Sequence, residues 1–90
     1  QPDLLKAKFI IRNLEIEAQK QLARTKKGFL FQTKLSANTI KVLNELRNGI
    51  TLGEAIKRTA GRKNLLKDEK QTILEITQLL NFGMLKVDKS

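Results

Sequence analysis

The chain has 90 residues and a net charge of +9, because 18 Lys and Arg outnumber 9 Asp and Glu. A chain of this length forms one domain with a small core and no deep cleft. It contains no Cys and no His, which excludes disulfides, thiolate metal sites and the most common general base. Its apolar runs are much shorter than the roughly 20 residues of a membrane span. We therefore expect a cytoplasmic protein without membrane segment, metal or cofactor and, because the chain begins with Gln, a fragment of a larger protein.

The first 28 residues form an N-terminal helical or extended segment, which we distinguish from a core at residues 29–90. Its first apolar residues recur at helical spacing and indicate one face of a helix: Leu4, Ala7 and Ile11. From Leu14 to Ala18 apolar and polar residues alternate, which is typical of a strand, although a helix also stays open there. Residues 19–25 favour a helix because Ala, Gln and Lys are good helix formers, and Gly28 ends that helix or turns the chain.

The core begins with a predicted strand at Phe29–Lys34, whose aromatic and Thr residues favour extended backbone. A single strand cannot satisfy its own backbone groups, so this strand needs a partner. We expect it to pair with a second short strand at Met84–Val87. Phe29 and Phe31 have the chemistry to stack on nucleic-acid bases, but with 4 aromatic residues in the whole chain we assign both to the core.

Two amphipathic helices follow the first of these strands. The first covers Leu35–Leu46, and Ser36 is a good N-cap for it. The second covers Thr51–Arg58 and begins with a capping box. In that motif the hydroxyl of Thr51 accepts a backbone hydrogen bond and the carboxylate of Glu54 reaches back. The turn between these two helices contains an Asn-Gly pair that stops the first one.

A third helix is predicted over Asp68–Phe82, with Asp68 as its N-cap and Gln71 three residues later. Gly83 follows this helix and suits the left-handed backbone that commonly ends one. Residues 61–67 connect the second and third helices. They form a basic loop that also carries two adjacent Leu residues, which we expect to fill the space between the two helices.

The apolar stripes of the helices define a predicted core. On the third helix the stripe consists of Ile73, Ile76 and Leu80, and Leu74 and Leu79 widen it. The full predicted core contains the following residues: Leu35, Ile40, Leu43, Leu46, Ile56, Ile73, Ile76, Leu80 and Phe82.

This order of elements predicts a mainly α domain with a small β component. Three helices and a trailing strand are typical of a helix-turn-helix core, so we expect a winged-helix-like fold with two or three short strands. The few residues after Val87 are too short to form a second wing strand, so no full wing is expected.

The acidic residues offer no catalytic constellation. Glu15 and Glu17 lie two apart, and Asp68 and Glu69 stand at a helix start, where the helix dipole stabilises negative charge. These positions fit surface solvation and capping better than acid-base chemistry. Gly49 and Gly53 lack the Lys-Ser or Lys-Thr pair of a phosphate loop. The sequence therefore predicts no catalytic, cofactor-binding or metal-binding residue, and we expect that the chain is not an enzyme.

Basic residues gather around the connector between the second and third helices. In a DNA-binding helix-turn-helix, this turn and the start of the last helix face the groove. The candidate contacts to nucleic acid or another anionic partner are Lys57, Arg58, Arg62, Lys63, Lys67, Lys70 and Gln71. The connector has six or seven residues, about twice the usual length of such a turn. A Lys-rich surface also serves solubility, so nucleic-acid binding is the alternative function.

From about Leu14 to Val87 the chain resembles the small winged-helix-type domain at the C-terminus of some class I S-adenosylmethionine-dependent methyltransferases, where it follows a regulatory region. The resemblance rests on core and cap residues that follow the strand-like Phe29–Lys34. These are Leu35 and Ser36, then Leu43, Leu46 and Gly49, then Leu52, Glu54 and Ala55, and finally Leu79, Leu80, Gly83, Met84, Leu85 and Val87. The peptide-binding PqqD-like domains share much of this outline.

The resemblance implies a non-catalytic regulatory or protein-interaction domain of a larger bacterial protein. It transfers no catalytic residue and no cofactor site, so the methyl donor would bind elsewhere in the parent protein. The implied partner is the catalytic domain of that parent or another polypeptide. An exposed edge of the Phe29–Lys34 strand could accept an extended peptide by strand addition.

Overall fold

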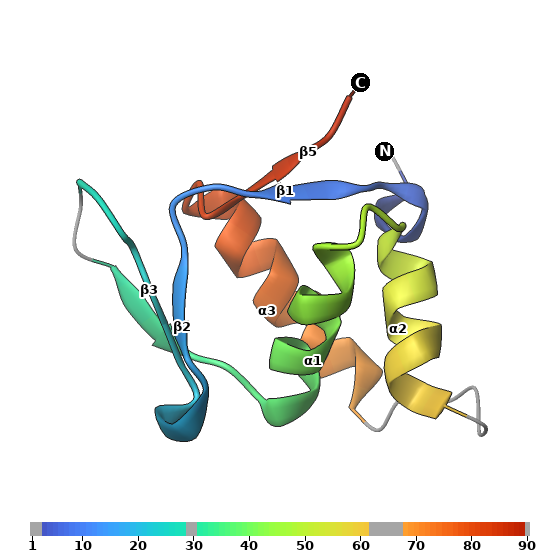
Figure 1. Cartoon of the computed structure of the whole chain (residues 1–90), viewed down its shortest axis with the longest axis horizontal. Coiled ribbons are helices and arrows are strands. Elements are labelled where there is room, and N and C mark those ends of the chain that lie inside the picture. Colours follow the sequence, from blue (N-terminus) through green and yellow to red (C-terminus); the bar gives the residue numbers. More distant parts are fainter. Residues whose placement is uncertain (1–2, 29–30, 62–67, 90) are drawn as a thin grey trace.

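The computed structural model describes residues 3–28, 31–61 and 68–89. Within these ranges the chain is a mixed arrangement of three α-helices, five short strands and two 3-10 turns (Figure 1). The helices are α1 (Ala37–Leu46), α2 (Leu52–Ala60) and α3 (Glu69–Asn81). The strands are β1 (Phe9–Ile11), β2 (Glu15–Glu17), β3 (Leu22–Arg24), β4 (Gln32–Lys34) and β5 (Leu85–Val87). The 3-10 turns are η1 (Leu4–Lys6) and η2 (Ala18–Lys20).

The strands of the described residues form two antiparallel sheets, and in Figure 1 β1 and β5 lie across one end of the helices. The 2-stranded sheet joins β1 to β5, with Phe9 opposite Val87. The 3-stranded sheet has the order β2-β3-β4. The predicted pairing of Phe29–Lys34 with Met84–Val87 is therefore wrong. The turn that contains Gly28, at φ +84°, brings β4 back onto β3, so β4 pairs with its neighbour in the chain.

The N-terminal segment is mostly extended, so the helices predicted there are wrong. The predicted helical face at residues 4–11 divides into η1 and β1. At residues 14–18 the strand alternative is confirmed as β2. Residues 19–25 form the end of η2 and β3 instead of a helix, and Gln21 turns the chain between them with a left-handed backbone at φ 53°. Strand pairing, of β1 with the distant β5 and of β3 with its neighbours β2 and β4, overrides the local helix propensity of this segment.

The helices of the core begin largely where the capping residues predict. The hydroxyl of Ser36 accepts the backbone N–H of Thr39 at 3.3 Å, and the hydroxyl of Thr51 accepts that of Glu54 at 3.2 Å. Gly83 has the expected positive φ, at +76°. The capping prediction for Asp68 is wrong. Its backbone is left-handed at φ 59°, and its side chain makes no capping hydrogen bond.

One hydrophobic cluster joins the helices to the N-terminal segment. It includes predicted core residues of α1 and α2 and, from the first 28 residues, Phe9, Leu14 and Ala23. Of the predicted core, the buried members are Leu35, Ile40, Leu43, Leu46, Ile56 and Ile76, while Ile73 and Leu80 are partly buried.

The predicted buried face of α3 is rotated relative to the observed one. Phe82, predicted in the core, is 53% exposed, and Leu74 is 52% exposed. Helix α3 buries Thr72 and Glu75 together with Ile76 and Leu79. The two polar residues can be buried because they have hydrogen-bond partners on α1 and at its N-terminus. A prediction that considers only apolar residues therefore misplaces the buried face of α3.

Candidate functional site

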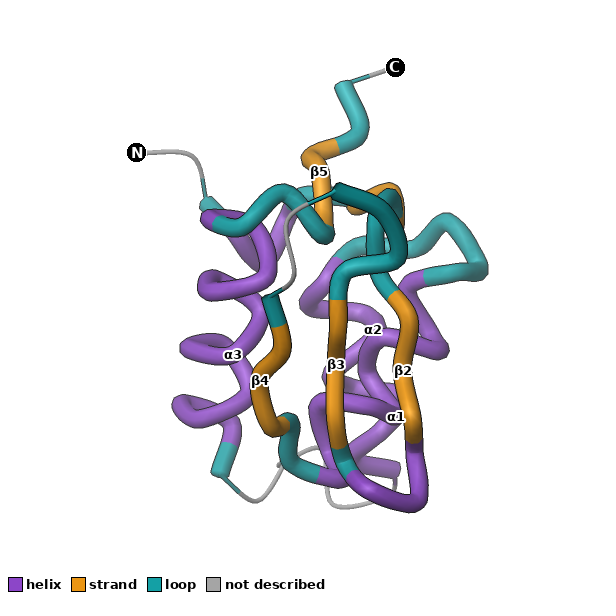
Figure 2. Tube along the Cα trace, turned by 90° about the vertical axis from the view of Figure 1, so that its left-hand side faces the viewer, coloured by secondary structure: helices purple, strands orange, loops and turns teal. Residues whose placement is uncertain are grey.

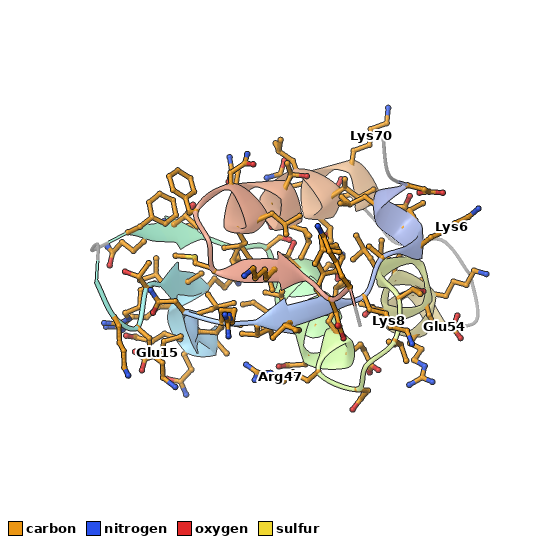
Figure 3. All side chains as sticks on the ribbon, turned by 90° about the horizontal axis from the view of Figure 1, so that it is seen from above. Lys6, Lys8, Glu15, Arg47, Glu54 and Lys70 are labelled. Carbon is orange, nitrogen blue, oxygen red and sulfur yellow. The ribbon has the colours of Figure 1, made fainter. Side chains whose placement is uncertain are left out.

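The structure describes only some residues of the predicted basic cluster. Arg62, Lys63 and Lys67 lie outside the described residues, as do the two Leu residues of the same connector. Lys57 and Arg58 are exposed on α2, and Lys70 and Gln71 are exposed in the first turn of α3. Figure 3 shows Lys70 pointing away from the body of the protein.

Most of the described residues of that cluster contact or lie near acidic side chains, which weakens their attraction for an anionic ligand. Arg58 forms an ion pair with Glu45 of α1, with 3.6 Å between the charged atoms. The amide nitrogen of Gln71 donates to Glu75 at 2.9 Å. Lys57 shares a small hollow with Glu69, which also precedes Lys70 in the chain. The described part of this surface is thus a mixture of positive and negative groups.

A buried polar junction ties α3 to the start of α1. Glu75 is 7% exposed, and its Oε1 accepts the backbone N–H of Ser36 at 3.0 Å and the Ser36 hydroxyl at 3.1 Å. The hydroxyl of Thr39 also donates to Oε1, and Gln71 donates to Oε2. Thr72 completes the junction through its hydroxyl, 3.2 Å from that of Thr39. Every described buried side-chain polar atom has a partner.

The charge of Glu75 is stabilised by this junction. Burial raises the pKa of the Glu75 carboxyl, but hydrogen bonds from Gln71, Thr39 and Ser36 lower it. The balance leaves the pKa below its usual value of 4.5. Because the carboxylate accepts several hydrogen bonds and lies beside the N-terminus of α1, it acts as a structural anchor between two helices.

One strip of α3 runs alongside β4. Gln71, Glu75, Gln78 and Phe82 recur at intervals of three and four residues, so they share one side of the helix. The strip contacts the β4 segment near both of its ends. The Phe82 ring stacks on Phe31 with 3.8 Å between centroids and 19° between planes, and Glu75 holds the chain just after β4. Figure 2 shows β4 between β3 and α3.

The outer edge of β4 carries unpaired backbone groups. On its inner edge, the backbone N–H of Thr25 donates to Phe31 at 2.9 Å, and that of Leu35 donates to Gln21 at 2.8 Å. Hydrogen bonding alternates along an antiparallel strand, so of the three residues between Phe31 and Leu35, the N–H and C=O groups of Gln32 and Lys34 point away from β3. Among the described residues these outward groups have no hydrogen-bond partner, because β4 is the last strand of its sheet.

The unpaired edge and the exposed side chains of α3 together form the candidate site, which we call the β4 edge site. It consists of the outward backbone of Gln32 and Lys34 and the side chains of Leu74, Gln78 and Phe82. The sequence predicted strand addition at an exposed edge of Phe29–Lys34, but Phe82 was assigned to the core and Leu74 to the widened stripe of the third helix, so the contribution of α3 to this surface was missed. The polar residues Gln71 and Gln78, seven apart and beside Phe82 on the helix, were the available signal that part of this side faces solvent.

Other kinds of site find little support in the described residues. No group of three or more His, Cys, Asp or Glu side chains is placed to hold a metal ion in the described ranges. In the same ranges no helix has both the length and the apolar character needed to cross a membrane. Comparisons of the chain with protein-family models, with curated proteins and with solved structures give no match.

Proposed function

We propose that this domain is a non-catalytic interaction module that binds an extended polypeptide by strand addition at the β4 edge site. The observation that carries the proposal is the unpaired outer edge of β4 beside α3. An added strand would hydrogen-bond to the outward groups of Gln32 and Lys34 and extend the 3-stranded sheet. Leu74 and Phe82 would bury apolar side chains of the bound segment.

A winged-helix-like architecture belongs to the same proposal. In this interpretation β5 is the strand that follows the last helix, and β1 supplies the second wing strand from the other end of the described chain. Support comes from Lys8, which follows η1 and bridges to Thr51 at the start of α2. Strand β1 therefore lies between the start of α2 and β5. In this interpretation β1 takes the place of a second wing strand after Val87.

The parent of such a module would be a larger bacterial protein, of the methyltransferase type that the sequence resembles. The catalytic domain of that parent, or a polypeptide that it modifies, would then supply the bound segment. The β4 edge site suits either source, since strand addition recognises mainly backbone groups. Nucleic-acid binding through residues 57–71 stays a prediction, because part of that cluster lies outside the described residues.

The proposal is tested by selecting binders from a display library of random 12-residue peptides and measuring the affinity of the selected peptides. We expect Gln32→Pro, which removes one outward N–H, to weaken peptide binding about tenfold or more. The matched variant Gln32→Ala removes the side chain but keeps the N–H, so it should bind within about twofold of the parent chain.

Residue-resolved hydrogen exchange provides the direct readout of strand addition. The amide hydrogens of Gln32 and Lys34 should exchange more slowly when a selected peptide is bound. Equal peptide affinity for Gln32→Pro and the parent chain, or unchanged exchange at both amides, would overturn the proposal. Circular dichroism of each variant confirms that the fold is intact.

A further inference from the structure

A second surface lies over the 2-stranded sheet, away from the β4 edge site. Two adjoining hollows mark it. One, of about 600 Å³, is lined by Ile10, Arg12, Lys86, Val87 and Lys89. The other, of about 460 Å³, is lined by Arg12, Asn13, Lys26 and Lys27. Arg12 belongs to both hollows, and we call the five basic residues of the pair the Arg12 surface.

The register of the sheet brings part of this surface together. Ile10 lies directly opposite Lys86, and the backbone N–H of Arg12 donates to Met84 at 3.0 Å. Side chains of a strand alternate between its two faces, so Arg12 shares the outer face with Ile10 and Lys86 while Phe9 points into the core. Figure 3 looks onto this sheet from above.

Asn13 brings the remaining two cations to Arg12. Its Oδ1 accepts the backbone N–H of Lys27 at 2.6 Å, and its Nδ2 donates to the carbonyl of the same residue. This pair of hydrogen bonds clamps the turn that carries Lys26 and Lys27 against the chain next to Arg12. Both polar atoms of the Asn13 amide bond to Lys27, so Asn13 acts as a positioning residue and leaves the cations to face a ligand.

Most charges of the Arg12 surface lack acidic neighbours in the described part of the chain, although Lys26 also lines a separate hollow with Glu15. Neither hollow is lined by a described acidic residue, and no described ion pair involves any of the five cations. Other cations are paired: Lys20 and Arg24 contact acidic residues of β2, and Arg58 contacts Glu45. Uncompensated positive charges on one face repel each other and attract anions.

We propose that the Arg12 surface binds the phosphodiester backbone of a nucleic-acid strand. Phosphate fits because the guanidinium fork of Arg12 can make two hydrogen bonds to it and the Lys side chains act as point charges. The cations follow two adjoining open hollows instead of one closed pocket, which suits a repeating chain of phosphates better than a single anion. No described aromatic side chain lines the hollows, so we expect binding without base preference.

The test uses fluorescence anisotropy with a labelled 20-nucleotide single-stranded oligonucleotide of mixed sequence, at 50 and 200 mM salt. The triple variant Arg12→Gln, Lys86→Gln, Lys89→Gln should bind about tenfold or more weakly at 50 mM salt and show a shallower salt dependence. The control Lys6→Gln, Lys20→Gln, Lys41→Gln removes three positive charges elsewhere on the exposed surface and should bind within about threefold of the parent chain. Equal weakening of both would overturn the proposal, as would no binding by the folded parent at 50 mM salt.

Two further measurements sharpen the assignment. Asn13→Ala leaves the net charge unchanged but frees the Lys26–Lys27 turn, so it should weaken binding about threefold and reduce the salt slope. If poly-glutamate competes as well as the oligonucleotide at equal charge, the partner is an acidic polypeptide and the proposal fails. Gln32→Pro should leave oligonucleotide binding unchanged, so this surface and the β4 edge site can fail independently.

Discussion

Two clusters of polar side chains, the buried junction around Glu75 and the ion pairs of Arg24, differ in how far they are exposed to solvent. At the buried junction, the carboxylate of Glu75 accepts hydrogen bonds from α1 and from its own helix, and it is almost fully removed from solvent. On the outer face of the 3-stranded sheet, Arg24 pairs with Glu15 and Glu17, and these side chains are about one third to one half exposed. The difference teaches that burial, more than the number of opposite charges, decides how firmly a polar group holds this fold.

The largest loss of stability is expected from a substitution on the buried face of α3. Ile76 is 0% exposed, so Ile76→Ala should lower the free energy of unfolding by roughly 2 to 5 kcal/mol. Leu74→Ala, two residues away on the exposed side, should cost less than about 1 kcal/mol. Urea denaturation of both variants measures the difference. A loss under about 1 kcal/mol for Ile76→Ala would mean that this face of α3 is assigned incorrectly.

A smaller and pH-dependent effect is expected at the buried junction. Glu75→Gln should lower the free energy of unfolding at pH 7 by roughly 1 to 3 kcal/mol, because charged hydrogen bonds become neutral ones. The folded pKa of Glu75 lies below its usual value of 4.5, so its contribution is present above that value and is lost as the pH falls through the folded pKa. Denaturation at pH 7 and below pH 4 should show the two chains converging in acid. A constant difference across this range would contradict the charged junction.

The smallest effect is expected at the exposed ion pairs. Glu15→Gln removes a contact of 3.4 Å to Arg24 and should change the free energy of unfolding by about 0.2 to 1 kcal/mol. The change should shrink further as salt rises, because the pair is open to solvent. Thermal unfolding at low and high salt is the measurement. A change in the free energy of unfolding as large as that of Glu75→Gln would show that the exposed ion pairs stabilise the fold as much as the buried junction does.

The candidate sites show how the limits of sequence reasoning arise. The cations of the Arg12 surface are far apart in sequence, and only the pairing of β1 with β5 and the Asn13 clamp bring them together. The cluster predicted from sequence was contiguous in the chain, which made it easy to find. Phe82 was assigned to the core, and Leu74 to the widened stripe of the third helix, because apolar spacing cannot distinguish a face that meets the core from one that meets a partner.

The sequence by itself determined the features whose partners lie within a few residues. Ser36 and Thr51 cap their helices through N–H groups three residues away, and Gly83 ends α3 with a backbone conformation that glycine adopts without strain. The tertiary structure decided the rest. Phe9 pairs with Val87 near the other end of the chain, and Glu75 bonds to Ser36, which is 39 residues away. Such pairings depend on which distant backbone and side-chain polar groups need partners when the chain folds.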